Sequence, residues 1–270
     1  MHGLDLVNTV ILVGSALVLI GIFSSLVATR FGAPLLLVFL VVGMLAGQDG
    51  PGGIVFSNYR VTYLVGSIAL SVILFDGGLR PRLSAFRGVL APSMLLATVG
   101  VLVTAALTGA VAWAVLGLAP VEALLLGSIV ASTDAAAVFF LLRTGGLRLQ
   151  SRVGSTLEIE SGTNDPVAVF LVLLLTQYLL AGGQMTGWHL ALIVAQQAVL
   201  GAAAGVTGGL ALVAILNRVS MPGGLHPLLV VATAVLIAAA TSLAGGSGLL
   251  AAYIAGLVMA NRPTRAYPSI

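Results

Sequence analysis

The chain has 270 residues, of which 59% are hydrophobic and only 7% charged, and its mean hydropathy is +1.17. These values lie outside the range of soluble globular proteins and indicate a polytopic membrane protein. The lack of cysteine excludes disulfides, thiolate metal sites and thiol nucleophiles. The formal charge of +3 comes from arginines spread thinly over the whole length, so the composition does not favour a nucleic-acid partner.

Apolar runs separated by charged or Gly/Pro-rich stretches predict about nine transmembrane helices in an all-α fold. In chain order the runs cover residues 6–28, 33–47, 61–79, 89–117, 121–142, 153–180, 188–216, 226–244 and 247–261. The first run follows no basic stretch, and its one early charge is Asp5. We therefore expect a retained first span and not a cleaved signal peptide.

The loops between these spans carry charge unequally. All eleven basic residues are arginines, and of these only Arg60 lies in an even-numbered loop. The others lie in the odd-numbered loops or in the tail after the last span. Because cytoplasmic loops collect positive charge, this pattern predicts that the odd-numbered loops are inside and the N-terminus is outside.

Three acids, Asp76, Asp134 and Asp165, lie in or at the end of apolar runs and not in loops. An Asp at the bilayer centre costs about 2.5–3.5 kcal/mol on insertion scales, so each is a candidate functional residue. At helical rise, Asp134 lies about 12 Å from the cytoplasmic end of the fifth run, and Asp165 about 18 Å from the start of the sixth. Two carboxylates at similar depth on adjacent helices can share one cation. The alternatives are neutral, hydrogen-bonded acids that hold helices together and, for Asp76, a helix-end pair with Arg80.

The sixth run contains the segment ESGTNDP, residues 160–166. Pro166 has no N–H, so the carbonyl of Gly162 loses its helical partner, and we expect a break in the helix there. The hydroxyls and amide beside it, those of Ser161, Thr163 and Asn164, would make this an oxygen-rich stretch. Irregular backbone of this kind is tolerated in a membrane only where it lines a cavity, as a cation site does.

Two further patterns concern packing and helix ends. Gly201, Gly205 and Gly209 recur every four residues, a spacing that lets two helices approach closely, either within the chain or between two copies of it. Ser132 and Thr133 can cap a helix that restarts at Asp134, although neither residue by itself indicates a break.

Several blocks of the sequence resemble the monovalent cation:proton antiporter-1 family, and especially its cell-volume-regulation, potassium/proton branch. They are ILFDGGLR, VASTDAAAVFF, LEIESGTNDPVAVFL, LHPLL and GSGLLAAYIAGLVMANRP, and the similarity extends over essentially the whole chain. The resemblance implies an NhaA-like antiporter fold with an interrupted fifth helix, in the bacterial inner membrane, without a cofactor and as a homodimer. The family continues beyond a ninth span, so the resemblance also implies that the chain corresponds to the N-terminal part of such an antiporter.

Matched residue by residue, the resemblance implies that Asp134 and Asp165 bind the ion and the proton. It implies that Thr133 and Ser161 lend oxygen ligands, and that Asn164 stands where electrogenic relatives carry an Asp.

The resemblance also assigns supporting roles. Glu160 is expected to form a structural ion pair with an arginine of a later helix, and Asp76 to contact the site through water. Residues 1–88 are expected to hold scaffold and dimerisation spans, and residues 89–180 the ion-binding core. Residues 181–270 are expected to hold a linker span and the start of a second inverted repeat.

The function that these observations favour is transport and not enzymatic catalysis. A monovalent cation, K⁺ in preference to Na⁺, and protons would compete at the Asp134–Asp165 pair, which yields exchange across the membrane. The sequence leaves two alternatives open: a cation channel or proton symporter that uses the same acids, and a membrane scaffold that does not transport.

Overall fold

The computed structural model describes residues 3–31, 35–80, 88–133, 138, 139, 142, 146, 147, 149–184, 186–219, 222 and 224–264. Within these ranges the regular structure is helical, apart from one isolated bridge between Gly47 and Ile54. The helices are α1 (Gly3–Phe31), α2 (Leu35–Ala46), α3 (Tyr59–Leu79), α4 (Leu90–Leu95), α5 (Val101–Leu116), α6 (Pro120–Ile129), α8 (Ser151–Leu180), α9 (Gly187–Arg218), α10 (Leu225–Leu243) and α11 (Gly248–Ala260).

Five helical stretches among the described residues are long and apolar enough to cross a membrane. They are Tyr59–Leu79, Leu90–Leu116, Ser151–Leu180, Gly187–Arg218 and Leu225–Leu243. Shorter apolar helices cover Ile11–Ser24, Leu37–Ala46, Pro120–Ile129 and Gly248–Ala260. Taken in chain order, each stretch overlaps one of the nine predicted runs, although Pro120–Ile129 covers only the first half of the fifth. The prediction of an all-α polytopic membrane protein is confirmed.

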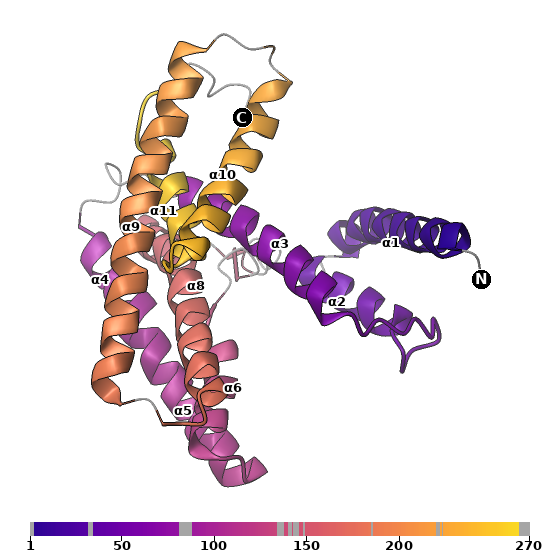
Figure 1. The fold of residues 1–270 in the computed structure, drawn as a ribbon, viewed down its shortest axis with the longest axis horizontal. Coiled ribbons are helices and arrows are strands. Elements are labelled where there is room, and N and C mark those ends of the chain that lie inside the picture. The colour runs from indigo at the N-terminus through magenta and orange to yellow at the C-terminus, as the bar shows by residue number, and fades with distance from the viewer. Residues whose placement is uncertain are drawn as a thin grey trace. The chain divides into compact units, whose positions relative to one another are not determined.

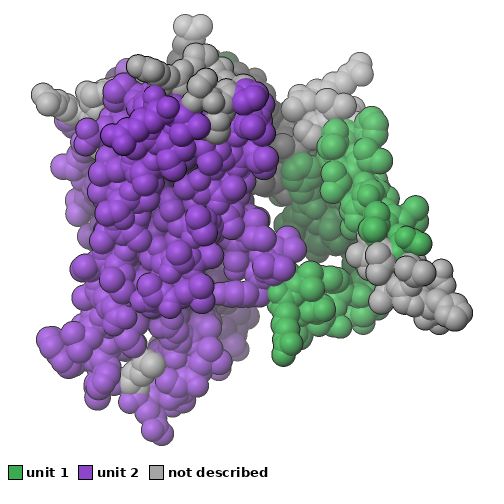
Figure 2. Space-filling model, turned by 45° about the horizontal axis from the view of Figure 1, so that its top comes forward, with its two compact units in different colours: residues 1–61, 136–148 green, residues 62–135, 149–270 purple. Residues whose placement is uncertain are grey.

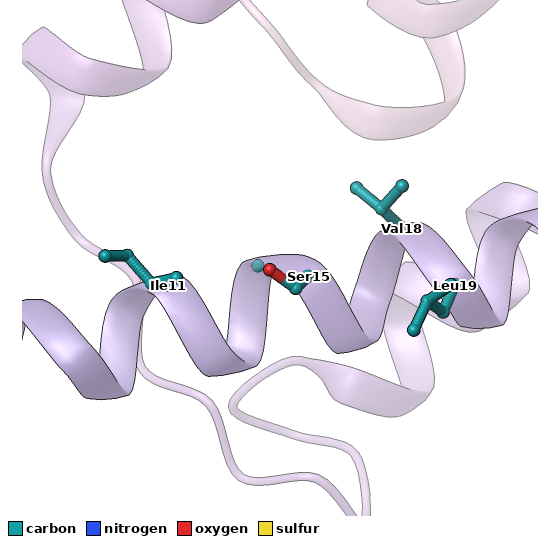
Figure 3. A pocket seen from close by; sticks show the side chains of 5 residues that line it. Ile11, Ser15, Val18 and Leu19 are labelled. Carbon is teal, nitrogen blue, oxygen red and sulfur yellow. The ribbon is translucent and has the colours of Figure 1, made fainter.

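The chain divides into two compact units, which Figure 2 distinguishes by colour. The first comprises residues 1–61 and 136–148. Within it α1 packs on α2, where Gly21 leaves room for the ring of Phe39. A shallow apolar hollow runs along one side of α1 (Figure 3) and is lined by Ile11, Gly14, Ser15, Val18 and Leu19. Among these lining residues the Ser15 hydroxyl is the one polar side-chain group, so the hollow offers no set of polar groups to bind a ligand.

In the second unit, residues 62–135 and 149–270, α9 and α11 are packed along each other, with α10 against both (Figure 1). A Cβ added at Gly205 would lie only 2.7 Å from the carbonyl oxygen of Ala251 on α11. Gly201 and Gly209 meet the same helix, so the glycine repeat packs within the chain. This is the close-approach packing that small residues permit between membrane helices.

The C-terminal end of α3 crosses α11 at two glycines. A Cβ on Gly78 would collide with the carbonyl oxygen of Tyr253, and a Cβ on Gly256 would collide with that of Phe75. Ser71, Leu74 and Phe75, on the same side of α3 as Gly78, are buried. The two backbones therefore touch without intervening side chains.

The stretch from α4 to α5 is one apolar span that contains a π-helical turn at Leu96–Gly100. Before this turn, the buried hydroxyl of Ser93 lies 2.8 Å from its own helix's carbonyl at Val89 and 3.2 Å from the Thr156 carbonyl on α8. After it, α5 packs closely on α6 through Gly109 and Gly127.

The fifth predicted span is interrupted, as expected from the resemblance. Its first helix, α6, ends at Ile129, and residues 131–133 have no regular structure. Helical backbone is present again at Val138 and Phe139.

The predicted helix break at Gly162 and Pro166 is wrong. Helix α8 runs without interruption from Ser151 to Leu180 and contains Pro166 in its interior. A proline removes one N–H, and membrane helices tolerate it where Ser/Thr side chains and neighbouring helices bond to the backbone. The carbonyl affected here is that of Gly162, and the helical geometry of α8 is kept around it.

Candidate functional site

The candidate site lies where the non-helical residues 131–133 pass along one side of α8. The hydroxyl of Ser161 donates to the main-chain carbonyl of Thr133 at 3.0 Å. The same carbonyl lies 3.4 Å from the amide nitrogen of Asn164, and Thr133 itself is not helical. The interruption of the fifth span therefore presents a main-chain oxygen to the polar side chains of α8.

Asn164 is the centre of the site and is fully buried, at 0% exposure. Its amide nitrogen donates to the Thr133 hydroxyl at 2.6 Å and to Glu160 Oε1 at 2.9 Å. Its amide oxygen lies 3.3 Å from the Ser132 hydroxyl oxygen. A buried amide with partners on both of its ends has one favourable orientation, so Asn164 fixes the segment 131–133 against α8.

Asp165 joins this network through Ser132. The Ser132 hydroxyl makes a short hydrogen bond to Asp165 Oδ1 in addition to its contact with Asn164. Asp165 lies at intermediate exposure on the same side of α8 as Ser161. Ser132 therefore connects the carboxylate to the amide of the neighbouring residue.

Glu160 accepts hydrogen bonds from Asn164 and from the Thr133 hydroxyl, the latter at 3.1 Å. The carboxylate of Glu160 therefore belongs to the same hydrogen-bond network as Asn164 and Thr133. Its expected ion pair with an arginine of a later helix stays a prediction.

Asp134 lies outside the described residues, so its predicted position next to Asp165 stays a prediction. The residue before it, Thr133, is held on α8 by the contacts described above. Asp76 is exposed and pairs at 2.7 Å with Arg80, the residue that follows the end of α3. The helix-end pairing considered for Asp76 is thus present, and its contact with the site through water stays a prediction.

Of the predicted site residues, the structure brings together Thr133, Ser161, Asn164, Asp165 and Glu160. Sequence reasoning missed Ser132 as a site residue, although it stands in the same Ser-Thr-Asp segment.

It also missed a contact on the other side of α8, where the Thr163 hydroxyl lies 3.0 Å from the hydroxyl of Tyr253 on α11. The one available signal was the tyrosine itself, a single phenol in an otherwise aliphatic and glycine-rich helix.

Chemically, the site gathers hydroxyl, amide, main-chain carbonyl and carboxylate oxygens in a short space. Oxygen ligands of this kind suit hard cations, and carboxylates also bind protons. Interrupted helices that present carbonyl oxygens near the middle of a membrane are the arrangement that cation-coupled transporters use. The site can therefore hold either a cation or a proton.

The sequence is similar to those of known cation/proton exchangers. The family model described as the transmembrane sodium/hydrogen exchanger matches residues 15–267. The chain is 47% identical over 218 residues to the K⁺/H⁺ antiporter NhaP of Alkalimonas amylolytica, covering 81% of this chain and 38% of that protein. It is 43% identical over 267 residues to the K⁺/H⁺ antiporter NhaP2 of Shewanella oneidensis, covering 98% of this chain and 46% of that protein.

Among solved structures, the fold is similar to that of the sodium proton antiporter MjNhaP1 from Methanocaldococcus jannaschii. The TM-score is 0.79 at 23% identity, over 95% of this chain and 62% of that one. The chain thus spans less than half the length of the two curated relatives.

Proposed function

The chain belongs to the sodium/hydrogen exchanger family, and on that premise we propose that the protein exchanges a monovalent cation for protons across the membrane. The observation that carries the proposal is the hydrogen bonding of residues 131–133 to the polar side of α8. That contact joins Ser132 to Asp165 and the Thr133 carbonyl to Ser161. The relatives at 43–47% identity are named K⁺/H⁺ antiporters, which supports K⁺ as the transported cation in preference to Na⁺.

The proposed mechanism is competition for one site. Asp165, with Asp134 as the predicted second carboxylate, binds either the cation or a proton. Two nearby carboxylates repel each other, which favours protonation of one of them when no cation is present. A bound cation stabilises both charged forms and releases the proton. Thr133 and Ser161 supply oxygen ligands, and Asn164 holds the two segments together. Alternating exposure of the site to the two faces of the membrane completes the exchange.

The experiment is proton flux in everted vesicles or proteoliposomes that contain the full-length protein, on addition of K⁺, Na⁺ or Li⁺. We expect K⁺ to drive proton release and the variants Asp165→Asn and Asp134→Asn to lower it to background at equal amounts of folded protein. Wild-type exchange by both variants would show that these carboxylates are structural. Cation flux without proton movement would identify a channel instead, and absence of both would identify a scaffold.

We also propose that the protein resides in the bacterial inner membrane with its N-terminus outside, as the arginine distribution favours. The chain contains no cysteine, so a single Leu147→Cys variant can be labelled selectively. Leu147 is 63% exposed. In intact cells the cysteine should resist an impermeant thiol reagent and react after permeabilisation. Equal labelling before and after permeabilisation would reverse the proposed orientation. The homodimer and the grouping of spans into scaffold, core and repeat remain predictions from the resemblance.

A further inference from the structure

Two opposite sides of α8 have different partners. Glu160, Ser161, Asn164 and Asp165 face the candidate site, whereas Ile159, Thr163 and Pro166 recur at helical spacing on the other side and are buried. Thr163 is the polar member of this second set, and its hydroxyl lies 3.0 Å from the hydroxyl of Tyr253.

The direction of this hydrogen bond follows from counting protons. Thr163 has one hydroxyl hydrogen and donates it to the Ile159 carbonyl at 2.7 Å. Tyr253 must therefore be the donor in the contact between the two hydroxyls. The phenol thus donates to a residue adjacent to Asn164, the centre of the site.

Tyr253 is itself firmly held. Only 6% of it is exposed, and the small residues around it on α11, Ala251, Ala252 and Ala255, are completely buried. Its main-chain carbonyl touches α3 at Gly78, while its side chain reaches α8. A Cβ added at the preceding residue of α3, Gly77, would lie 4.0 Å from the Gly162 carbonyl oxygen of α8. Helices α3, α8 and α11 therefore meet around Tyr253.

We propose that Tyr253 is a positioning residue for the ion site: its hydroxyl fixes the rotation of α8 on α11, so that Asn164 and Asp165 meet residues 131–133. This inference rests on the proposed exchange function. The contact between α8 and α11 is small, and it includes the hydrogen bond between Tyr253 and Thr163. Hydrogen bonds between membrane helices are individually weak, so losing this one should shift the site without unfolding the protein.

The test compares Tyr253→Phe with wild type in the full-length protein. Removing the hydroxyl alone should raise the apparent KM for K⁺ by about threefold to tenfold and leave the maximal exchange rate nearly unchanged. Thr163→Val should have the same effect, the double variant should add nothing further, and Thr163→Ser should restore wild-type KM. Tyr63→Phe is the matched control, because Tyr63 is 77% exposed on α3. An unchanged KM in Tyr253→Phe, with active wild type, would overturn the proposal.

A second measurement does not depend on transport. Hydrogen–deuterium exchange of the backbone over residues 157–167 should be faster in Tyr253→Phe than in wild type or Tyr63→Phe. If wild type shows no cation/proton exchange, the proposed function fails, and this measurement still decides the positioning role. Equal deuterium uptake in wild type and Tyr253→Phe would refute that role.

Discussion

Two regions of the second unit hold helices together in opposite ways. Where α11 meets α3 and α9, glycines bring backbone against backbone, and Gly78, Gly205 and Gly256 have no space for a side chain. Where residues 131–133 meet α8, side chains of α8 donate hydrogen bonds to the main-chain carbonyl and to the hydroxyl of Thr133. Lipid supplies no hydrophobic force between helices, so close packing and polar bonds are what drive their association.

The glycine contacts form a rigid support, whereas the polar contacts around Asn164 can be exchanged for contacts with a bound ion. A glycine contact is set by shape and cannot be remade with another partner, which suits a fixed support. The bonds around Asn164 use groups that can also bind a cation or a proton. The comparison predicts that substitutions in the glycine region lower stability, whereas those in the polar region change ion binding more than folding.

The largest effect is expected for Gly78→Ala, with Gly77→Ala as the matched control. The Cβ at residue 78 would collide with the Tyr253 carbonyl, and backbone cannot move aside as a side chain can. We expect a loss of about 3 kcal/mol or more in stability, seen as a low yield and a lower Tm in detergent. At Gly77 the nearest atom is 4.0 Å away, so alanine should fit, with a change below about 1 kcal/mol. Equal Tm values for the two variants would contradict this account of the crossing.

The next effect concerns Asn164→Ala, which removes the buried centre of the polar region. The Thr133 hydroxyl and Glu160 would each lose a partner, which costs about 1–3 kcal/mol. Exchange should fall strongly, and the Tm should fall less than in Gly78→Ala. A larger fall in Tm than in Gly78→Ala would remove the proposed distinction between the two regions.

Asn164→Asp tests charge at the same position. Asn164 now donates to Glu160 at 2.9 Å, and two carboxylates at that distance cannot both stay ionised. The variant should therefore bind an additional proton, and its exchange should acquire a dependence on membrane potential. Flux measured at several imposed potentials tests this, and a voltage-independent variant would show that residue 164 takes no part in proton binding.

Ser132→Ala should have a smaller effect. It removes the hydroxyl that connects Asp165 to Asn164 and leaves all other contacts of the site. One hydrogen bond contributes about 1 kcal/mol, so the apparent affinity for K⁺ should fall by up to about fivefold, with a smaller fall in Tm than in Asn164→Ala. Ser128→Ala is a suitable control, since that hydroxyl bonds only to its own helix, at the Leu124 carbonyl, among the contacts described.

The smallest change in stability is expected for Pro166→Ala. Alanine restores the N–H that the Gly162 carbonyl otherwise lacks at this position, and α8 is already helical there. Stability should rise by about 0.5 kcal/mol, measured as a slightly higher Tm. If the Gly162 carbonyl is a cation ligand, the apparent cation affinity should fall at the same time, whereas unchanged affinity would exclude that carbonyl from the site.

The sequence predicted the helices well because hydropathy and length depend only on local composition. The resemblance implied that Thr133, Ser161, Asn164 and Asp165 share a site, and hydrogen bonds connect these residues. The break before Thr133 could not be derived from the residues themselves, since Ala131, Ser132 and Thr133 contain no helix breaker. Hydrogen bonds from α8 stabilise the open conformation there, and these depend on tertiary contacts.

The same limitation explains the wrong prediction at Pro166, where local chemistry indicated a break and the surrounding structure keeps the helix intact. It also explains why Tyr253 was missed. The hydroxyls of Thr163 and Tyr253 are 90 residues apart in the chain, and their meeting depends on how α11 lies on α3 and α9.

The π-helical turn at Leu96–Gly100 changes the direction in which the buried residues of the fourth span face. Five of the residues buried along it, Ser93, Ala97, Val101, Ala105 and Gly109, are spaced by four. In a regular α-helix each such step drifts by about 40° around the axis, so the two ends of this row would face in well-separated directions. The wider π turn takes up part of that drift and lets the row meet α8 at one end and α6 at the other. Deleting one residue within the turn would therefore return it to a regular α-helix and leave α5 facing α6, whereas deleting one between Val101 and Gly109 would rotate the rest of α5 by about 100° and turn Gly109 away. This turn should thus tolerate the loss of one residue better than the helices on either side of it.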